Sequence, residues 1–82
     1  MWKIEPACKD YRLYAEYFVE GDSCCTIKEQ VTKGEVFFSA AVYSINGEEC
    51  CFLYEYDFDV LKLKCLIKAK EFGWDIKGLK LI

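Results

Sequence analysis

The 82-residue sequence contains no histidine, the side chain that serves most often as a general base and as a metal ligand. Nucleophile pairs of the Ser–His and Cys–His kinds are therefore excluded. The five glycines stand singly along the chain, so there is no glycine-rich loop of the kind that cradles phosphates. From these absences we expect that the chain is not an enzyme and that it uses no cofactor.

Long apolar runs are also missing. No stretch approaches the roughly 18 uninterrupted apolar residues of a membrane-spanning helix, so we expect no membrane segment. Residues 1–6 lack the basic start and the following apolar run of a secretory signal. This favours the cytoplasm of the host cell as the location of the protein; the alternative is a secreted form whose signal has already been removed.

The composition is that of a folded domain. Hydrophobic residues make up 54% of the chain and aromatic residues 17%, which excludes a disordered or low-complexity segment. A chain of this length holds one core, so residues 1–82 are expected to form a single domain.

Six cysteines allow three interpretations: reduced thiols in the core or at the surface, disulfides, or a metal site. The pairs Cys24-Cys25 and Cys50-Cys51 fall in predicted strands, where adjacent side chains point to opposite faces. Such pairs do not converge on one ion as the C-x2-4-C spacing of zinc sites does. We favour reduced thiols, assign no metal ligands, and keep a thiol or zinc-binding protein as an alternative. The other two cysteines are Cys8 and Cys65.

Alternating apolar and polar residues predict antiparallel strands over the first two thirds of the chain. The predicted turns are 21–23, 33–34 and Asn46-Gly47, the last a two-residue hairpin turn with positive φ at both positions. Residues 35–45 are apolar or small on both sides, which predicts a strand covered on both faces. A short edge strand before Pro6 suits residues 2–5. The predicted strands are 11–20, 24–32, 35–45 and 48–56.

A helix is predicted to begin at Asp57-Phe58-Asp59, whose carboxylates suit the free N–H groups of a first turn, and to end at Gly73. The predicted fold class is α+β: an antiparallel meander of three to four strands packed on one C-terminal helix in two layers. A short closing strand over residues 79–82 would complete it. At helical spacing, one apolar stripe should lie on the sheet; its residues are Phe58, Leu61, Cys65, Ala69 and Phe72.

The same helix carries a second apolar face, formed by Val60, Leu63 and Ile67. Exposed apolar patches usually mark interaction sites, so this face needs a cover. One cover is a partner or a second copy, which would make the chain a homodimer or a homo-oligomeric structural module. The other cover is the chain itself, through Trp2, Ile4, Trp74, Leu79, Leu81 and Ile82.

Charge is unevenly distributed. Residues 1–59 hold five Lys/Arg and twelve Asp/Glu, whereas residues 60–82 hold six Lys and two acids. Within residues 46–59 there is no cation. An acidic segment of this kind either serves only solubility or attracts basic protein surfaces. Direct nucleic-acid binding is not expected, because the lysines are scattered and the tyrosines are assigned mostly to the core and to cross-strand pairs. The expected partner-binding residues are Glu48, Glu49, Glu55, Asp57 and Asp59.

The order of parts over about residues 35–75 resembles small phage-encoded anti-CRISPR proteins. The resemblance lies in the strands, the Asn46-Gly47 turn, the acidic helix start and the helix end Ala69-Lys70-Glu71-Phe72-Gly73-Trp74. It implies a non-enzymatic inhibitor that mimics DNA, with the acidic residues named above placed on a basic, nucleic-acid-binding groove of a CRISPR effector. This sequence lacks the acidic tail of that group, because its own C-terminal segment is basic and apolar.

Overall fold

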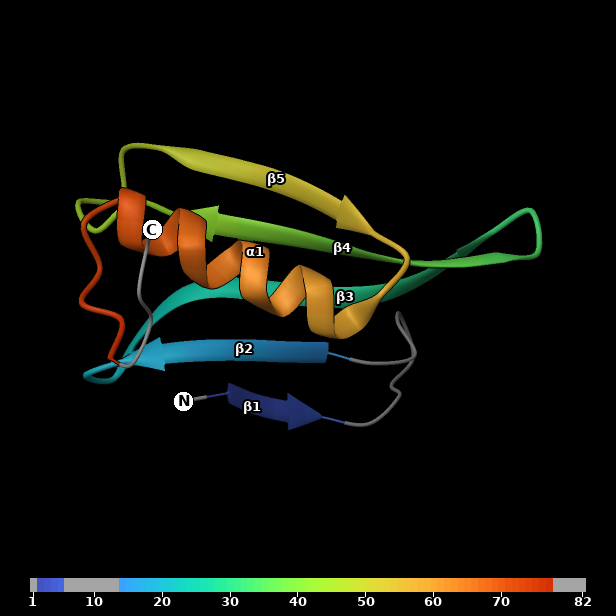
Figure 1. The fold of residues 1–82 in the computed structure, drawn as a ribbon, viewed down its shortest axis with the longest axis horizontal. Coiled ribbons are helices and arrows are strands. Elements are labelled where there is room, and N and C mark those ends of the chain that lie inside the picture. Colours follow the sequence, from blue (N-terminus) through green and yellow to red (C-terminus); the bar gives the residue numbers. More distant parts are fainter. Residues whose placement is uncertain (1, 6–13, 78–82) are drawn as a thin grey trace.

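The computed structural model describes residues 2–5 and 14–77, which form five strands and one helix. All neighbouring strands are antiparallel, and their order in the sheet is their order in the chain (Figure 1). The helix follows the last strand and lies across one face of the sheet. The elements are β1 (Trp2–Glu5), β2 (Tyr14–Val19), β3 (Asp22–Thr32), β4 (Glu35–Tyr43), β5 (Cys50–Glu55) and α1 (Phe58–Glu71).

This architecture confirms the α+β class and the two layers, but the predicted number of strands was too low. The edge strand expected at residues 2–5 is present as β1, and it brings the sheet to five strands by pairing with β2 from Trp2↔Tyr17 to Glu5↔Tyr14. The rings of Trp2 and Tyr17 meet edge to face with their centroids 5.1 Å apart, a geometry that favours this pairing. The closing strand expected at residues 79–82 lies outside the described residues.

The core lies between α1 and the adjoining face of the sheet. Leu61, Cys65 and Ala69, spaced four residues apart on α1, are fully buried, and Phe58 and Phe72 pack against the same cluster. The predicted sheet-facing stripe of the helix is therefore confirmed. On the sheet side, the buried strand residues are Ala15, Cys24, Cys25, Ile27, Ala40 and Val42.

Two hairpins are closed by two-residue turns. Glu20-Gly21 joins β2 to β3 and Lys33-Gly34 joins β3 to β4, and all four residues have positive φ. Such turns match the twist of the paired strands. The first turn therefore precedes the predicted position at residues 21–23, because Asp22 and Ser23 already belong to β3.

The loop between β4 and β5 differs from the predicted hairpin turn at Asn46-Gly47. Only Gly47 has positive φ there. The side chains of Ser44 and Asn46 accept hydrogen bonds from backbone N–H groups of the loop. Ser44 Oγ accepts from the Glu49 N–H at 2.9 Å, and Asn46 Oδ1 accepts from the Glu48 N–H at 3.0 Å. These side-chain hydrogen bonds add to two backbone hydrogen bonds, from the Gly47 N–H to the Ser44 carbonyl at 3.0 Å and from the Ser44 N–H to the Glu49 carbonyl at 2.9 Å, and the connection spans residues 44–49.

The ends of α1 lie where the sequence predicted them. Asp57 is the N-cap residue, and its Oδ1 accepts a hydrogen bond from the Val60 N–H at 3.0 Å. At the other end, Gly73 follows the helix with a φ of 101°. The indole N–H of Trp74 then donates to the Tyr43 carbonyl at 2.7 Å, which ties the chain after the helix to the end of β4.

Removing the cap tests the start of the helix. We expect Asp57→Ala to lower the free energy of unfolding by about 0.5–2 kcal/mol, because the first turn loses its side-chain acceptor. Asp57→Asn is the matched control and should cost less, since the amide oxygen still accepts the same hydrogen bond. Urea denaturation measures both values, and equal losses in the two variants would show that the cap does not stabilise the helix.

Candidate functional site

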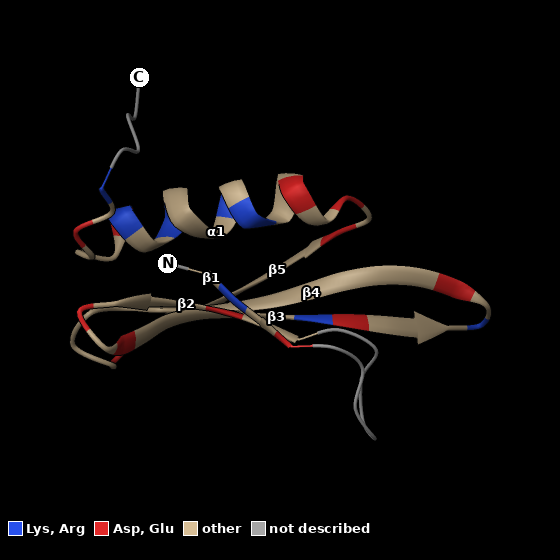
Figure 2. Ribbon diagram, turned by 90° about the horizontal axis from the view of Figure 1, so that it is seen from below, with Lys and Arg blue, Asp and Glu red and all other residues tan. Residues whose placement is uncertain are grey.

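The face of the sheet opposite α1 carries no other element of the described residues (Figure 2). Ala40, Val42 and Leu53 point toward the helix side and belong to the core or pack against it. Because side chains alternate along a strand, their neighbours point to the uncovered face. The prediction that β4 is covered on both faces is therefore wrong for the described part of the chain: the one helix covers one face only.

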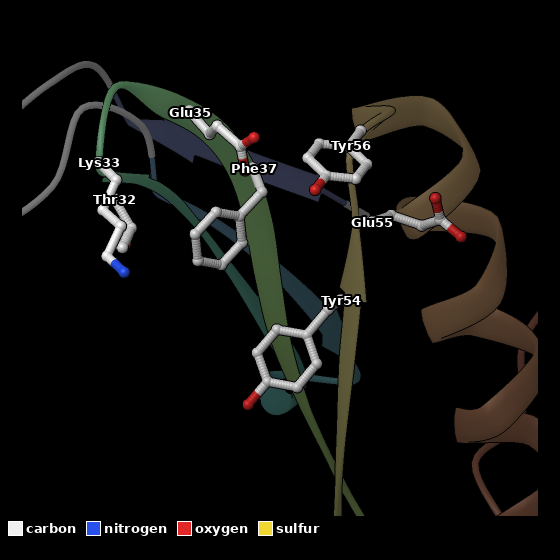
Figure 3. A pocket seen from close by; sticks show the side chains of 7 residues that line it. All are labelled: Thr32, Lys33, Glu35, Phe37, Tyr54, Glu55 and Tyr56. Carbon is white, nitrogen blue, oxygen red and sulfur yellow. The ribbon is translucent and has the colours of Figure 1, made fainter.

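Aromatic side chains gather on this uncovered face along β4 and β5. Phe52 and Tyr54 of β5 are 66% and 64% exposed, and Tyr56, the residue after the strand, is 71% exposed, which is unusual for three large rings at alternate positions. The ring centroids of Phe37 and Tyr54 lie 6.5 Å apart. Figure 3 shows Phe37, Tyr54 and Tyr56 on the same side, with Glu55 turned toward the helix. We call this surface the aromatic patch; it comprises Phe37, Tyr43, Phe52, Tyr54 and Tyr56.

Sequence reasoning missed the aromatic patch. The tyrosines were assigned mostly to the core and to cross-strand pairs. Tyr17 packs against the core and the ring of Tyr54 approaches Phe37 of β4, but Tyr43, Tyr54 and Tyr56 are exposed. One signal was available: a strand that is apolar on both faces, in a chain with only one predicted helix, leaves one face without a cover.

Two shallow depressions adjoin the patch. One, of about 330 Å³, has small residues Ser39 and Ala41 in its lining and Phe52 and Tyr54 beside them. The other, of about 580 Å³, lies between the Lys33-Gly34 turn and the end of β5 (Figure 3). Large side chains standing beside small ones form an uneven surface that a partner's side chains can enter.

The structure divides the five expected partner-binding carboxylates into two groups at opposite ends of β5. Glu48 and Glu49 lie in the loop before the strand, whereas Glu55 ends the strand and Asp57 and Asp59 follow it. A six-residue strand separates the groups by about 20 Å. They therefore do not form one continuous acidic hairpin.

The group before β5 has the freer carboxylates. Neither Glu48 nor Glu49 takes part in an ion pair among the described residues, and both are exposed. The Asn46 side chain donates to Glu48 Oε2 across 3.5 Å, at the long limit of a hydrogen bond. The negative charge at this end of β5 is thus not neutralised by a lysine in the described part of the chain.

The group after β5 is largely engaged within the chain. Lys64 of α1 donates to Glu55, and this hydrogen bond lowers the pKa of the Glu55 carboxyl. Lys62 lies 3.0 Å from Asp59, and Asp57 caps the helix. Asp57 and Asp59 nevertheless remain exposed. Because solvent screens exposed ion pairs and weakens them, these carboxylates are still partly available to a partner.

The thiols of the described cysteines are free. Cys24 and Cys25 are both fully buried, contrary to the expectation that adjacent residues point to opposite faces. The reason is a bulge: Tyr17 pairs with Cys25 but Phe18 with Ser23, so Cys24 is an extra residue that breaks the alternation.

The buried thiols lie close enough to influence one another. Hydrogen bonding to Cys24 and Cys65, together with burial, raises the pKa of the Cys25 thiol, and hydrogen bonding to Cys25 lowers the pKa of Cys24. Within residues 2–5 and 14–77, no group of three or more Cys, Asp or Glu side chains is placed to hold a metal ion.

Burial predicts the order in which the thiols react. Among the described cysteines, we expect a maleimide reagent to modify the exposed Cys50 first, while Cys24, Cys25 and Cys65 react only in denaturant, because folded packing denies the reagent access. Mass spectrometry of the digested protein assigns each modification to its residue. Modification of Cys25 or Cys65 in the folded protein at the rate of Cys50 would contradict the packing of the core.

The described residues also leave the second apolar helix face uncovered. Val60 is 42% and Leu63 51% exposed, and Ile67 is half-buried. Of the chain's own expected covers, Trp74 is buried in the core instead and Trp2 packs against Tyr17, while residues 79–82 lie outside the described part. The described helix lacks the length and apolar character needed to cross a bilayer.

Fold and site together define a two-layer α+β domain with one helix-covered face and one aromatic face between two acidic ends. Comparisons with protein-family models, with curated proteins and with solved structures gave no match for this chain.

Proposed function

We propose that this chain is a non-enzymatic protein-binding module whose partner docks along β5 and the aromatic patch. The observation that carries the proposal is the exposure of Phe52 and Tyr54 on β5 and of Tyr56 directly after it. Tyrosines and other large rings dominate the binding energy of protein interfaces, because each buries a large apolar area with few rotatable bonds.

Charge specifies the partner. Carboxylates stand at both ends of β5, and the middle of the strand, from Cys50 to Tyr54, carries no charge. A partner with basic residues around an apolar centre complements this arrangement and is drawn to it at long range. A protein surface that otherwise contacts nucleic acid has such chemistry, and covering it would make this chain an inhibitor. The resemblance to anti-CRISPR proteins agrees with that role.

The test is partner capture by matched surface variants. Captured proteins are cross-linked to the immobilised chain, and the linked segments are identified by mass spectrometry. We expect segments rich in Lys and Arg, attached near β5, and lost when Phe52 and Tyr54 are both replaced by threonine, which keeps the β-propensity of the strand. Leu63→Thr, at a site on the helix that is also exposed, should leave capture unchanged. The reverse sensitivity would overturn the proposal.

A second candidate is a homo-oligomeric module that uses Val60, Leu63 and Ile67. The exposure of Val60 and Leu63 favours it. Full burial contributes about 1.5–3 kcal/mol for a side chain that starts fully exposed, so burying the exposed half of each would contribute roughly half of that before the cost of association. Light scattering after size exclusion gives the mass directly. This function predicts a wild-type dimer that Leu63→Asp converts to a monomer; a wild-type monomer at high protein concentration excludes it.

A further inference from the structure

The two outer strands of the sheet are built differently. β1 has four residues, two of which are the charged Lys3 and Glu5, and Pro6 follows in the sequence. Short length, charge and proline are the means by which proteins keep an outer strand from pairing with another chain. Most of β5 lacks this protection, because its residues from Cys50 to Tyr54 include no charged residue and no proline.

β5 also has the geometry that strand pairing requires. Its pairing with β4 is unbroken from Tyr43↔Cys50 to Phe38↔Glu55, with no bulge. Among the described residues β4 is its only neighbour in the sheet, and β5 forms the outer border in Figure 1. Alternate backbone N–H and C=O groups of an outer strand point away from the sheet, where they are ready to pair.

The charges at the ends of β5 decide what kind of strand fits. A second copy paired antiparallel about the middle of β5 would place Glu48 and Glu49 of one chain near Glu55 and Asp57 of the other. Like charges facing each other across a strand pair are destabilising. A strand with Lys or Arg at both ends instead meets carboxylates at both ends, whichever direction it runs.

The aromatic patch specifies the middle of that strand. Phe52 and Tyr54 belong to β5 itself, so an added strand places the Cβ atoms of its opposing residues about 5 Å from theirs on the same face. Rings stabilise such pairs most when the opposing residues are β-branched or aromatic. The segment that fits therefore has apolar or β-branched residues in its middle and a basic residue at each end. About six to eight residues separate these two basic ends, which matches the separation of the two acidic groups.

We infer, on the basis of the proposed function, that β5 accepts one extended, basic-ended segment of a partner protein as a sixth strand of the sheet. Backbone hydrogen bonds to the outer side of β5 fix the segment. The rings of Phe52 and Tyr54 select its middle, and the carboxylates around Glu49 and Asp57 select its ends.

The probe is a synthetic peptide of about ten residues, alternating valine and threonine between two lysines at each end; we call it the Lys-ended peptide. Its matched control has glutamates at the same four positions. Titration of the complete 82-residue chain by fluorescence anisotropy should give at least roughly tenfold tighter binding of the Lys-ended peptide. The triple variant Glu48→Gln, Glu49→Gln, Asp57→Asn should lose this preference, and Asp57→Asn retains a helix cap.

Strand addition is read from the backbone. Hydrogen exchange followed by NMR should show slower exchange for the β5 amides that point away from β4, and only for those, when the Lys-ended peptide is bound. Backbone N-methylation of one alternate set of peptide residues should abolish binding, while N-methylation of the other set should leave it intact.

The outcomes separate the inference from the proposed function. Binding that leaves β5 exchange unchanged, or that tolerates both methylated sets, overturns strand addition while leaving a partner site on the aromatic patch. Equal affinity for the Lys-ended and Glu-ended peptides, or no binding of either, overturns the basic-ended strand as the occupant. The proposed function fails by a different result: partner capture that is unchanged when Phe52 and Tyr54 are both replaced by threonine.

Discussion

Replacing Leu61 with alanine is expected to lower the free energy of unfolding by about 2–5 kcal/mol. Leu61 is fully buried where α1 packs on the sheet, so its truncation leaves a cavity between the two layers. Domains of this size have a total stability of roughly 0.05–0.15 kcal/mol per residue, so the loss removes a large fraction of it. Urea denaturation followed by far-UV circular dichroism gives the value.

Leu63 provides the matched control, because it undergoes the same chemical change two residues along the same helix. Its side chain is 51% exposed, and Leu63→Ala should change the stability by no more than about 0.5 kcal/mol. If both variants lost the same stability, α1 would not lie on the sheet through the stripe that contains Leu61.

The second large effect concerns binding. Replacing Phe52 and Tyr54 together with threonine is expected to weaken binding of the Lys-ended peptide on the order of 100-fold, since two central aromatic contacts are lost. The fold should remain, because both side chains are mostly exposed and threonine is a favourable strand residue. Fluorescence anisotropy measures the affinity, and circular dichroism verifies the fold.

Val31→Thr is the control for this pair of substitutions. Val31 is 49% exposed on β3 and lies outside the aromatic patch, so its replacement should leave the affinity within about twofold. A comparable loss in this variant would mean that the affinity follows general changes of the sheet rather than the rings of Phe52 and Tyr54.

Local chemistry made the helix predictable from the sequence. Asp57 caps the first turn, Gly73 takes up the left-handed conformation after the last one, and Leu61, Cys65 and Ala69 repeat at helical spacing. Each of these signals depends on residues within a few positions of one another, so they can be recognised without knowledge of the tertiary structure.

The errors arose where distant residues decide the outcome. The bulge at Cys24 depends on how β2 pairs with β3, and no local pattern reports it. The 44–49 loop depends on the hydroxyl of Ser44 reaching the Glu49 N–H, which competes with the tight turn that Asn46-Gly47 favours.

The candidate site was predicted only in part. Glu48, Glu49, Glu55, Asp57 and Asp59 were recognised from their signs, but closeness in sequence did not make them one surface, because an extended strand holds its two ends apart. The aromatic patch was missed because burial of an aromatic residue depends on whether a second layer covers it, and sequence periodicity reports only which residues share a face.

The most direct test of a binding surface along β5 is NMR chemical-shift mapping of the labelled chain during titration with the Lys-ended peptide. The account predicts that the shift changes centre on Cys50–Glu55 and on the uncovered face of β4, with Val60, Leu63 and Ile67 unaffected. Shift changes centred on those three helix residues, with β5 unaffected, would contradict it.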